Sequence, residues 1–194
     1  MNSKILITFA TESGSTAELA QTLGEELSRS AERVDITPIP QVTNLDDYDT
    51  VIIGAPMIMG WHRQAVAFIK ANANQLAQKT VAYFFTSLNL TRTGEETIDD
   101  IPIYVDPNHG AAPQNPQKLN FMEKHTAPQG YVQPVLQKAP QVKPKTVACF
   151  GGKLDYSHLA FPAKIFVKYL IRGQEGDFRN MDAVREWGRS LEAA

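Results

Sequence analysis

The fold of this chain is decided near its N-terminus, by a stretch that reads Ile5-Leu6-Ile7-Thr8-Phe9-Ala10-Thr11-Glu12-Ser13-Gly14-Ser15-Thr16. Its first six residues form a nearly continuous apolar run, which is typical of a buried strand in a parallel sheet. Its last six form a Ser/Thr/Gly loop, and apolar side chains then recur at helical spacing. Such a strand, loop and helix start build a pocket in which backbone N–H groups and the helix dipole favour a phosphate.

The loop at residues 11–16 also indicates which kind of phosphate would bind. Its hydroxyl donors are Thr11, Ser13, Ser15 and Thr16. Gly14 permits a close approach of the backbone to a ligand. The loop has no Lys or Arg and contains Glu12, which favours a monoester phosphate over a triphosphate with magnesium. The alternative is a capped helix start without a ligand.

Composition limits the class of protein. The chain has 194 residues, of which 43% are hydrophobic and 21% charged, so we expect one globular domain over residues 1–194. A formal charge of −2 indicates no nucleic-acid partner. The single cysteine, Cys149, excludes an internal disulfide and a multi-cysteine metal site, and we expect no metal. No signal-peptide pattern or membrane-spanning apolar run is visible, which predicts a soluble cytoplasmic protein.

Apolar runs that alternate with amphipathic stretches predict the order of the elements. Strands are expected at Lys4–Ala10, Val34–Ile39, Thr50–Ala55, Thr80–Thr86 and Thr146–Gly151. Helices are expected at Thr16–Ser30, Gln64–Asn74, Pro162–Arg172 and Met181–Ala193. This alternation predicts an α/β fold with a doubly wound parallel sheet of five strands. Pro38 favours an edge position for the second strand, which gives the order 2-1-3-4-5.

The segment 92–144 interrupts this pattern. It carries eight of the twelve prolines and shows little strand or long-helix periodicity. A loop this long in a compact domain is usually functional or disordered. We interpret it as an insertion between strands 4 and 5, near the ligand-binding edge, with a short helix at Gln117–His125.

Missing motifs narrow the choice of ligand. The dinucleotide fingerprint G-x-G-x-x-G and the triphosphate loop G-x-x-x-x-G-K-[ST] are both absent. The ends of strands 1 and 3 carry no acid, as a phosphorylated receiver domain would need, and the loop has no phosphatase cysteine. A mononucleotide with a flavin-like ring remains.

The loops after the later strands suit such a ring, because ligands of this fold lie at the carboxyl ends of strands near the switch point. The loop after the third strand offers Pro56, Met57, Ile58, Met59, Gly60 and Trp61. The loop after the fourth offers Thr86, Ser87, Leu88, Asn89 and Leu90. A Gly-rich segment after the fifth adds Gly151, Gly152, Asp155 and Tyr156. For Trp61, core packing is the alternative interpretation.

These motifs carry a resemblance to a known family. Residues 11–16 resemble the T-x-[TS]-G-x-[TS] phosphate loop of flavodoxins, which binds FMN. The fuller resemblance is to the flavodoxin-like, quinone-dependent protoporphyrinogen dehydrogenase family, and it runs through residues 54–56, 60–62, 87–91 and 150–156. It implies FMN, two-electron oxidation and a quinone acceptor. The chain departs from that family after the third strand, where Ile58-Met59-Gly60-Trp61 stands in place of Arg-Tyr-Gly-His.

The resemblance implies an FMN-dependent oxidoreductase of the protoporphyrinogen-oxidising type, in which the flavin carries the redox chemistry. The alternative is a flavodoxin-type electron-transfer protein without a substrate of its own. His62 and Lys153 are catalytic candidates, and for each the alternative is a solvated loop side chain.

The expected helix at 162–172 combines a basic stripe with a wide apolar face. The stripe consists of Lys164, Lys168 and Arg172. A face of this kind can lie on the inner surface of a membrane, which would suit a quinone partner. The alternative is a helix packed on the sheet with its charges in water. From the family resemblance we expect a small-molecule or quinone redox partner.

Overall fold

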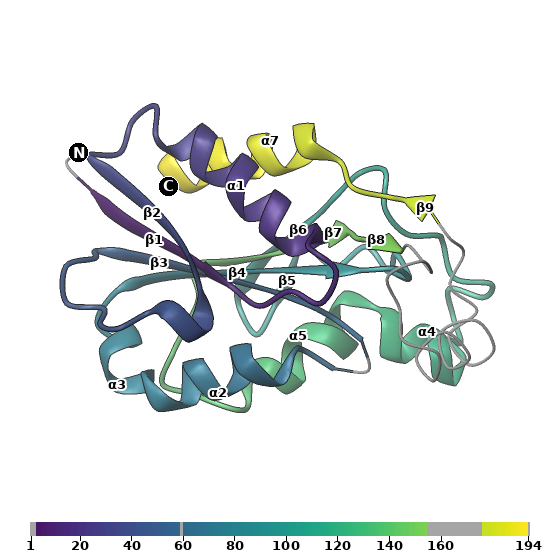
Figure 1. The fold of residues 1–194 in the computed structure, drawn as a ribbon. Coiled ribbons are helices and arrows are strands. Elements are labelled where there is room, and N and C mark those ends of the chain that lie inside the picture. The colour runs from purple at the N-terminus through teal and green to yellow at the C-terminus, as the bar shows by residue number, and fades with distance from the viewer. Residues whose placement is uncertain (1–2, 59, 155–175, 194) are drawn as a thin grey trace.

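The structure is a computed structural model that describes residues 3–58, 60–154 and 176–193 (Figure 1). Its elements in chain order are β1 (Lys4–Phe9), α1 (Ser15–Leu27), β2 (Arg33–Pro38), η1 (Ile39–Gln41), β3 (Thr50–Pro56), α2 (Arg63–Ala71), α3 (Ala73–Leu76), β4 (Thr80–Ser87), β5 (Thr97–Ile98), β6 (Ile101–Val105), α4 (Phe121–Thr126), α5 (Pro128–Leu136), β7 (Thr146–Gly151), β8 (Lys153–Leu154), β9 (Gly176–Asp177) and α7 (Met181–Ala193).

The main sheet has the strand order β2-β1-β3-β4-β7-β6-β5. Its neighbouring strands are parallel except for the antiparallel pair β5 and β6. The predicted order 2-1-3-4-5 is confirmed, with β7 as the fifth strand and β2 at the edge. The prediction of five strands is incomplete, because β6 and β5 extend the sheet beyond β7.

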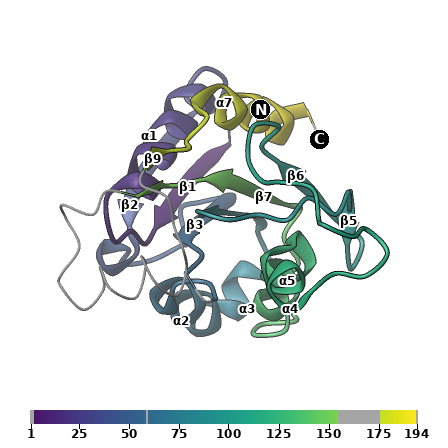
Figure 2. The same ribbon diagram turned by 90° about the vertical axis from the view of Figure 1, so that its right-hand side faces the viewer.

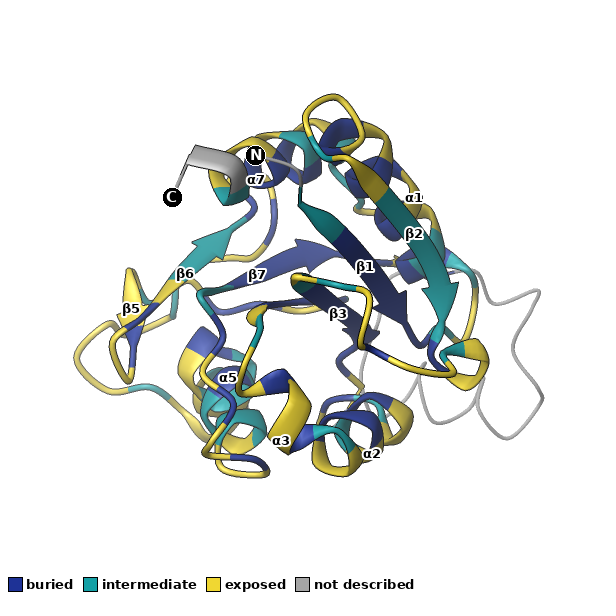
Figure 3. Ribbon diagram, turned by 90° about the vertical axis from the view of Figure 1, so that its left-hand side faces the viewer, coloured by how far each residue is buried: buried dark blue, intermediate teal, exposed yellow. Residues whose placement is uncertain are grey.

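Helices cover both faces of this sheet, with α1 and α7 on one side and α2, α3 and α5 on the other (Figures 1 and 2). Leu19, Leu23 and Leu27 recur at helical spacing on α1 and are buried against the sheet. The central strands β1, β3, β4 and β7 are buried on both faces, and Figure 3 shows the centre of the sheet in dark blue, whereas the edge strand β2 is half-buried. This double burial explains why the strands read as continuous apolar runs rather than alternating ones.

Gly54 on β3 is required by the packing of its neighbour. Phe84, its partner in register on β4, lays its ring over the position where a side chain would begin. A Cβ at residue 54 would lie 2.0 Å from the Cζ atom of that ring. Only glycine therefore fits at this position without a movement of Phe84.

The insertion at 92–144 contains more helices and strands than we expected from its many prolines. It contributes β5, β6, α4 and α5. The expected short helix at Gln117–His125 exists, but it begins at Phe121 because Asn120 and Glu123 form a capping box there. The helix α5 was missed because Pro134 lies inside it, where a proline removes a backbone hydrogen bond and normally disrupts a helix.

Two further expectations concern helices. The predicted helix at Gln64–Asn74 is divided into α2 and α3 at Asn72, which leaves the helical conformation with φ −108°. The predicted helix at Pro162–Arg172 lies outside the described residues. The predicted helix at Met181–Ala193 is confirmed as α7.

Candidate functional site

The loop at residues 11–16 joins β1 to the first turn of α1. Gly14 caps the helix in the left-handed conformation, with φ +87°, and its N–H donates to Thr11 Oγ1 at 2.9 Å. No side chain caps α1 at Gly14. Since the first N–H groups of a helix have no partner within it, this turn offers backbone donors to an anion.

Two contacts bind this loop to its neighbours. The buried hydroxyl of Thr16 lies 3.2 Å from that of Thr86, at the end of β4. On the outer side, Glu12 accepts from His62 Nε2 at 2.8 Å. His62 Nδ1 accepts from the N–H of Gln64 at 3.3 Å, so both ring nitrogens of this catalytic candidate are engaged. The hydrogen bond with His62 therefore holds the Glu12 carboxylate on the outer side of the loop.

The loop after β3 is a tight turn with an exposed tip. Met57 and Trp61 pair across it as an isolated bridge, and Gly60 has φ +115°. Trp61 Nε1 donates to the carbonyl of Ala55 at 3.1 Å, and the indole packs against Tyr83 with ring centroids 5.2 Å apart. The indole thus packs largely in the core, whereas Ile58 is exposed at the tip. Met59 lies outside the described residues.

The loop after β4 is held by residues of the insertion. Ser87 is buried, and its hydroxyl lies 2.9 Å from His109 Nε2. The carbonyl of Asn89 accepts from the hydroxyl of Tyr131 at 2.8 Å, and Leu90 packs in the core. Burial raises the pKa of Tyr131, so its phenol stays a neutral donor. Of this loop, Asn89 is the exposed residue and Leu88 is half-buried.

His109 lies close to a second buried ionisable group. Asp106 is fully buried, and its Oδ1 accepts from the backbone of Asn108 at 2.9 Å and from the side chain of Asn180 at 2.8 Å. Desolvation lowers the pKa of His109, while the charge of Asp106 acts in the opposite direction. The imidazole is therefore a neutral partner for Ser87.

The segment after β7 approaches the loop after β4 through its backbone. The N–H of Gly152 donates to the carbonyl of Ser87 at 2.9 Å. A Cβ on Gly151 would lie 2.0 Å from the carbonyl oxygen of Phe178, so this glycine is required by chain packing. Lys153 is exposed on β8, and Asp155 and Tyr156 lie outside the described residues.

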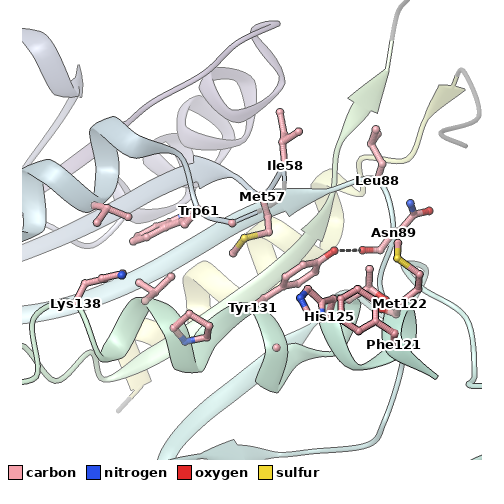
Figure 4. A pocket seen from close by; sticks show the side chains of 16 residues that line it. Met57, Ile58, Trp61, Leu88, Asn89, Phe121, Met122, His125, Tyr131 and Lys138 are labelled. Carbon is pink, nitrogen blue, oxygen red and sulfur yellow. Dashed lines mark hydrogen bonds between the residues drawn. The ribbon is translucent and has the colours of Figure 1, made fainter. Parts of the chain in front are cut away.

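A cavity of about 630 Å³ lies next to these loops (Figure 4). Its upper wall is formed by the loop after β3, and its lower wall by α4 and α5 of the insertion. Leu88 and Asn89 of the loop after β4 lie at one end, and Lys138 lies at the other. The cavity lining therefore combines two of the predicted ring-binding loops with side chains of the insertion.

Sequence reasoning missed the residues that fix these loops. They are Asp106, His109, Tyr131 and Arg179. Arg179 pairs with Glu18 in the first turn of α1 and with Asp177 on β9. The contacts of Ser87 with His109, Asn89 with Tyr131, Asp106 with Asn180 and Glu18 with Arg179 each join residues far apart in the sequence, so no spacing pattern predicts them.

Within the described ranges, no cluster of three His, Cys, Asp or Glu side chains could hold a metal ion. In the same residues, none of the helices has the length and apolar character needed to cross a membrane.

A flavodoxin-like α/β sheet with a Ser/Thr/Gly loop at a helix start defines a class of protein, and comparison identifies the family. The family model described as a flavodoxin domain matches residues 6–180. This chain belongs to the flavodoxin family. A search of curated proteins finds no match.

Several solved structures are similar to this chain. A flavodoxin from Streptococcus pneumoniae is 11% identical, with a TM-score of 0.50 and 97% of each chain covered. Oxidised flavodoxin 1 from Bacillus cereus is 17% identical, with a TM-score of 0.46, covering 87% of this chain and 99% of that one. A Fusobacterium nucleatum flavodoxin mutant bound to flavin mononucleotide is 16% identical, with a TM-score of 0.36, covering 47% and 54%. At 11% identity, the similarity to the Streptococcus pneumoniae flavodoxin shows the fold and nothing about function.

Proposed function

We propose that this protein binds FMN noncovalently and serves in electron transfer. The observation that carries the proposal is the loop at residues 11–16 at the start of α1, in a chain that belongs to the flavodoxin family. The phosphate would lie at this loop, with the ring beside the loops after β3 and β4. FMN supplies the redox chemistry when bound, and the chain positions it.

The described residues fit such a cofactor. The helix start offers backbone N–H groups, and Ser13 adds an exposed hydroxyl. The one carboxylate in the loop, on Glu12, is held by His62 at 2.8 Å. Asn89 leaves its side-chain amide at the exposed tip of its loop, where it could meet the polar edge of a ring.

A charge placed in the loop tests this site. We expect Ser13→Asp to weaken FMN binding at least about ten-fold, because two negative charges a few ångströms apart repel each other. Ser13→Ala keeps the loop neutral and should change the affinity by less than about three-fold. Thr43→Asp adds the same charge at an exposed position on another loop and serves as the control. The measurement is quenching of FMN fluorescence on titration with the protein.

Equal affinities for Ser13→Asp, Ser13→Ala and the unchanged chain would contradict the phosphate position. Loss of binding in Thr43→Asp as well would show that charge acts on the whole molecule rather than on the loop. Either result would remove the support that the loop gives to the proposal.

A second candidate function is an FMN-dependent oxidoreductase with an organic substrate, and the cavity beside the loops favours it. The protoporphyrinogen dehydrogenase type suggested by the sequence finds no support in the comparisons, so the substrate is open. A quinone or another small molecule is the proposed redox partner. Contact with a membrane through residues 162–172 stays a prediction.

Anaerobic addition of protoporphyrinogen to the FMN-loaded protein tests for an enzyme of the protoporphyrinogen-oxidising type. Bleaching of the flavin band together with formation of porphyrin would support the enzyme of that type. An unchanged band would contradict that type and would leave an electron carrier or an oxidoreductase with another substrate. Air oxidation of the substrate is controlled by the same mixture without protein.

A further inference from the structure

The cavity of about 630 Å³ is not accounted for by phosphate binding, since no residue of the loop 11–16 lines it. It follows α5 from Gly130 to Val135 and continues to Lys138, just beyond the end of that helix, with Val66 of α2 on the other side. Figure 4 shows Lys138 at the end opposite Leu88 and Asn89. The cavity therefore extends away from the carboxyl ends of the strands, along the helices that cover this face of the sheet.

The lining exposes apolar side chains that a ligand could cover. Four large hydrophobic side chains are exposed in the described part of the chain, and three of them line this cavity. They are Ile58, Phe121 and Met122, with exposed fractions of 46%, 72% and 56%. Gathering exposed apolar side chains at one concave site is unusual on a surface that needs only to be soluble. Their removal from water would favour binding.

The shape and chemistry of the walls favour an aromatic ligand. Trp61 lies in the wall formed by the loop after β3, and Tyr131 and Phe121 lie in the wall formed by the insertion (Figure 4). Phe121 packs against His125 with ring centroids 4.3 Å apart and a tilt of 34° between the rings. Met57 and Met122 add thioethers, which pack well against ring edges. A flat ring between these walls would contact aromatic or sulfur groups on both sides.

The charge of the lining favours an anion. Lys138 is the one lining residue with a fixed charge, and no carboxylate lines the cavity. Within the described residues, the Lys138 ammonium forms no ion pair or hydrogen bond. An anionic group that reached this end of the cavity would therefore meet an unpaired cation.

We propose that this cavity binds a flat aromatic molecule that carries a single carboxylate. Its ring lies between the wall of Trp61 and the wall of Tyr131 and Phe121, and its carboxylate points toward Lys138. The proposal goes beyond electron transfer by giving the protein a small-molecule site. Its placement next to the flavin, and only that, rests on the proposed FMN site.

The experiment compares two probes of the same size in calorimetric titrations of the FMN-loaded protein. One is 2-naphthoate, and the other is its neutral analogue 2-naphthalenemethanol. We expect one molecule of naphthoate per chain, bound about five-fold more tightly than the alcohol. Lys138→Gln should remove this difference, whereas Phe121→Ala should weaken both probes about five-fold. Lys143→Gln changes an exposed lysine outside the cavity and should change neither affinity.

Several results would overturn the proposal. These are the absence of saturable naphthoate binding, equal affinities of the two probes, or affinities that neither Lys138→Gln nor Phe121→Ala changes. Displacement of naphthoate from the flavin-free chain by FMN would also overturn it, because the cavity would then hold the flavin ring itself. If the chain does not retain FMN, the proposed function fails, and the titration of the flavin-free chain still decides on the cavity.

Discussion

The two faces of the sheet are packed in different ways. On one face, α1 and α7 close over the strands around Trp187, which is 1% exposed and contacts the rings of Phe84 and Phe150. On the other face, α2 and the insertion helices leave a cavity in which Phe121 remains exposed. Both faces belong to the same sheet of buried central strands, so the difference in packing comes from the helices that cover them.

This difference separates a closed face from a face with an open cavity. Side chains that fill a closed core contribute to the free energy of unfolding through burial and close contact. Side chains that line an open cavity can contribute little until a ligand covers them. The comparison therefore predicts that large aromatic residues on the two faces respond differently to the same substitution.

The largest expected effect is the loss of the ring at Trp187. We expect Trp187→Ala to lower the free energy of unfolding by about 3–5 kcal/mol, because it leaves a cavity in a closed core. The paired variant Phe121→Ala should change it by no more than about 0.5 kcal/mol, because that ring is mostly in water. Urea denaturation measures both. Similar losses in the two variants would contradict the division between the faces.

A methyl group at Gly54 should have a smaller but clear effect. Gly54→Ala places a Cβ against the ring of Phe84, and we expect a loss of about 1–3 kcal/mol from overpacking. The double variant with Phe84→Leu should recover part of this loss relative to Phe84→Leu alone, because the ring is gone. A double-mutant cycle by urea denaturation gives the coupling. Additive losses would show that the ring does not oppose the methyl group.

The smallest expected effect is a pH dependence from His109. Its pKa is lowered from the ordinary value of 6.5 by burial, with the charge of Arg92 adding to the shift and that of Asp106 opposing it. As the pH falls below 6.5, the unfolded chain takes up a proton that the folded chain does not, so the free energy of unfolding falls. Above that pH this contribution to stability is fully present.

His109→Gln should reduce this fall between about pH 7.5 and about pH 5.5, because glutamine does not titrate. Glutamine can still meet the hydroxyl of Ser87, which lies 2.9 Å from the imidazole. The measurement is urea denaturation at both pH values, and His125→Gln at an exposed position is the control. An unchanged pH dependence in His109→Gln would contradict the burial of a neutral imidazole.

The sheet and the loop at residues 11–16 could be predicted because their signals are local. Apolar runs mark strands that are buried on both faces, and Pro38 marks the edge. The polar loop follows β1 directly, so its place at a helix start needs no information from the rest of the chain. The family match over residues 6–180 is in line with these signals.

The insertion and its contacts could not be predicted because their signals are weak or distant. Pro102 lies in β6 and Pro134 in α5, and each argues against the element that contains it. The pairing of Ser87 with His109 joins a strand end to a loop 22 residues away. The inward packing of Trp61 depends on Tyr83 beneath it, and no property of the loop itself reveals that contact.

The most direct test of the account is an absorption spectrum of the purified protein after loading with FMN and removal of free cofactor. The account predicts that the flavin band is retained at about one FMN per chain, since the loop at residues 11–16 would hold the phosphate. The same preparation of Ser13→Asp should lose most of the band. A wild-type protein without a flavin band would contradict the central claim.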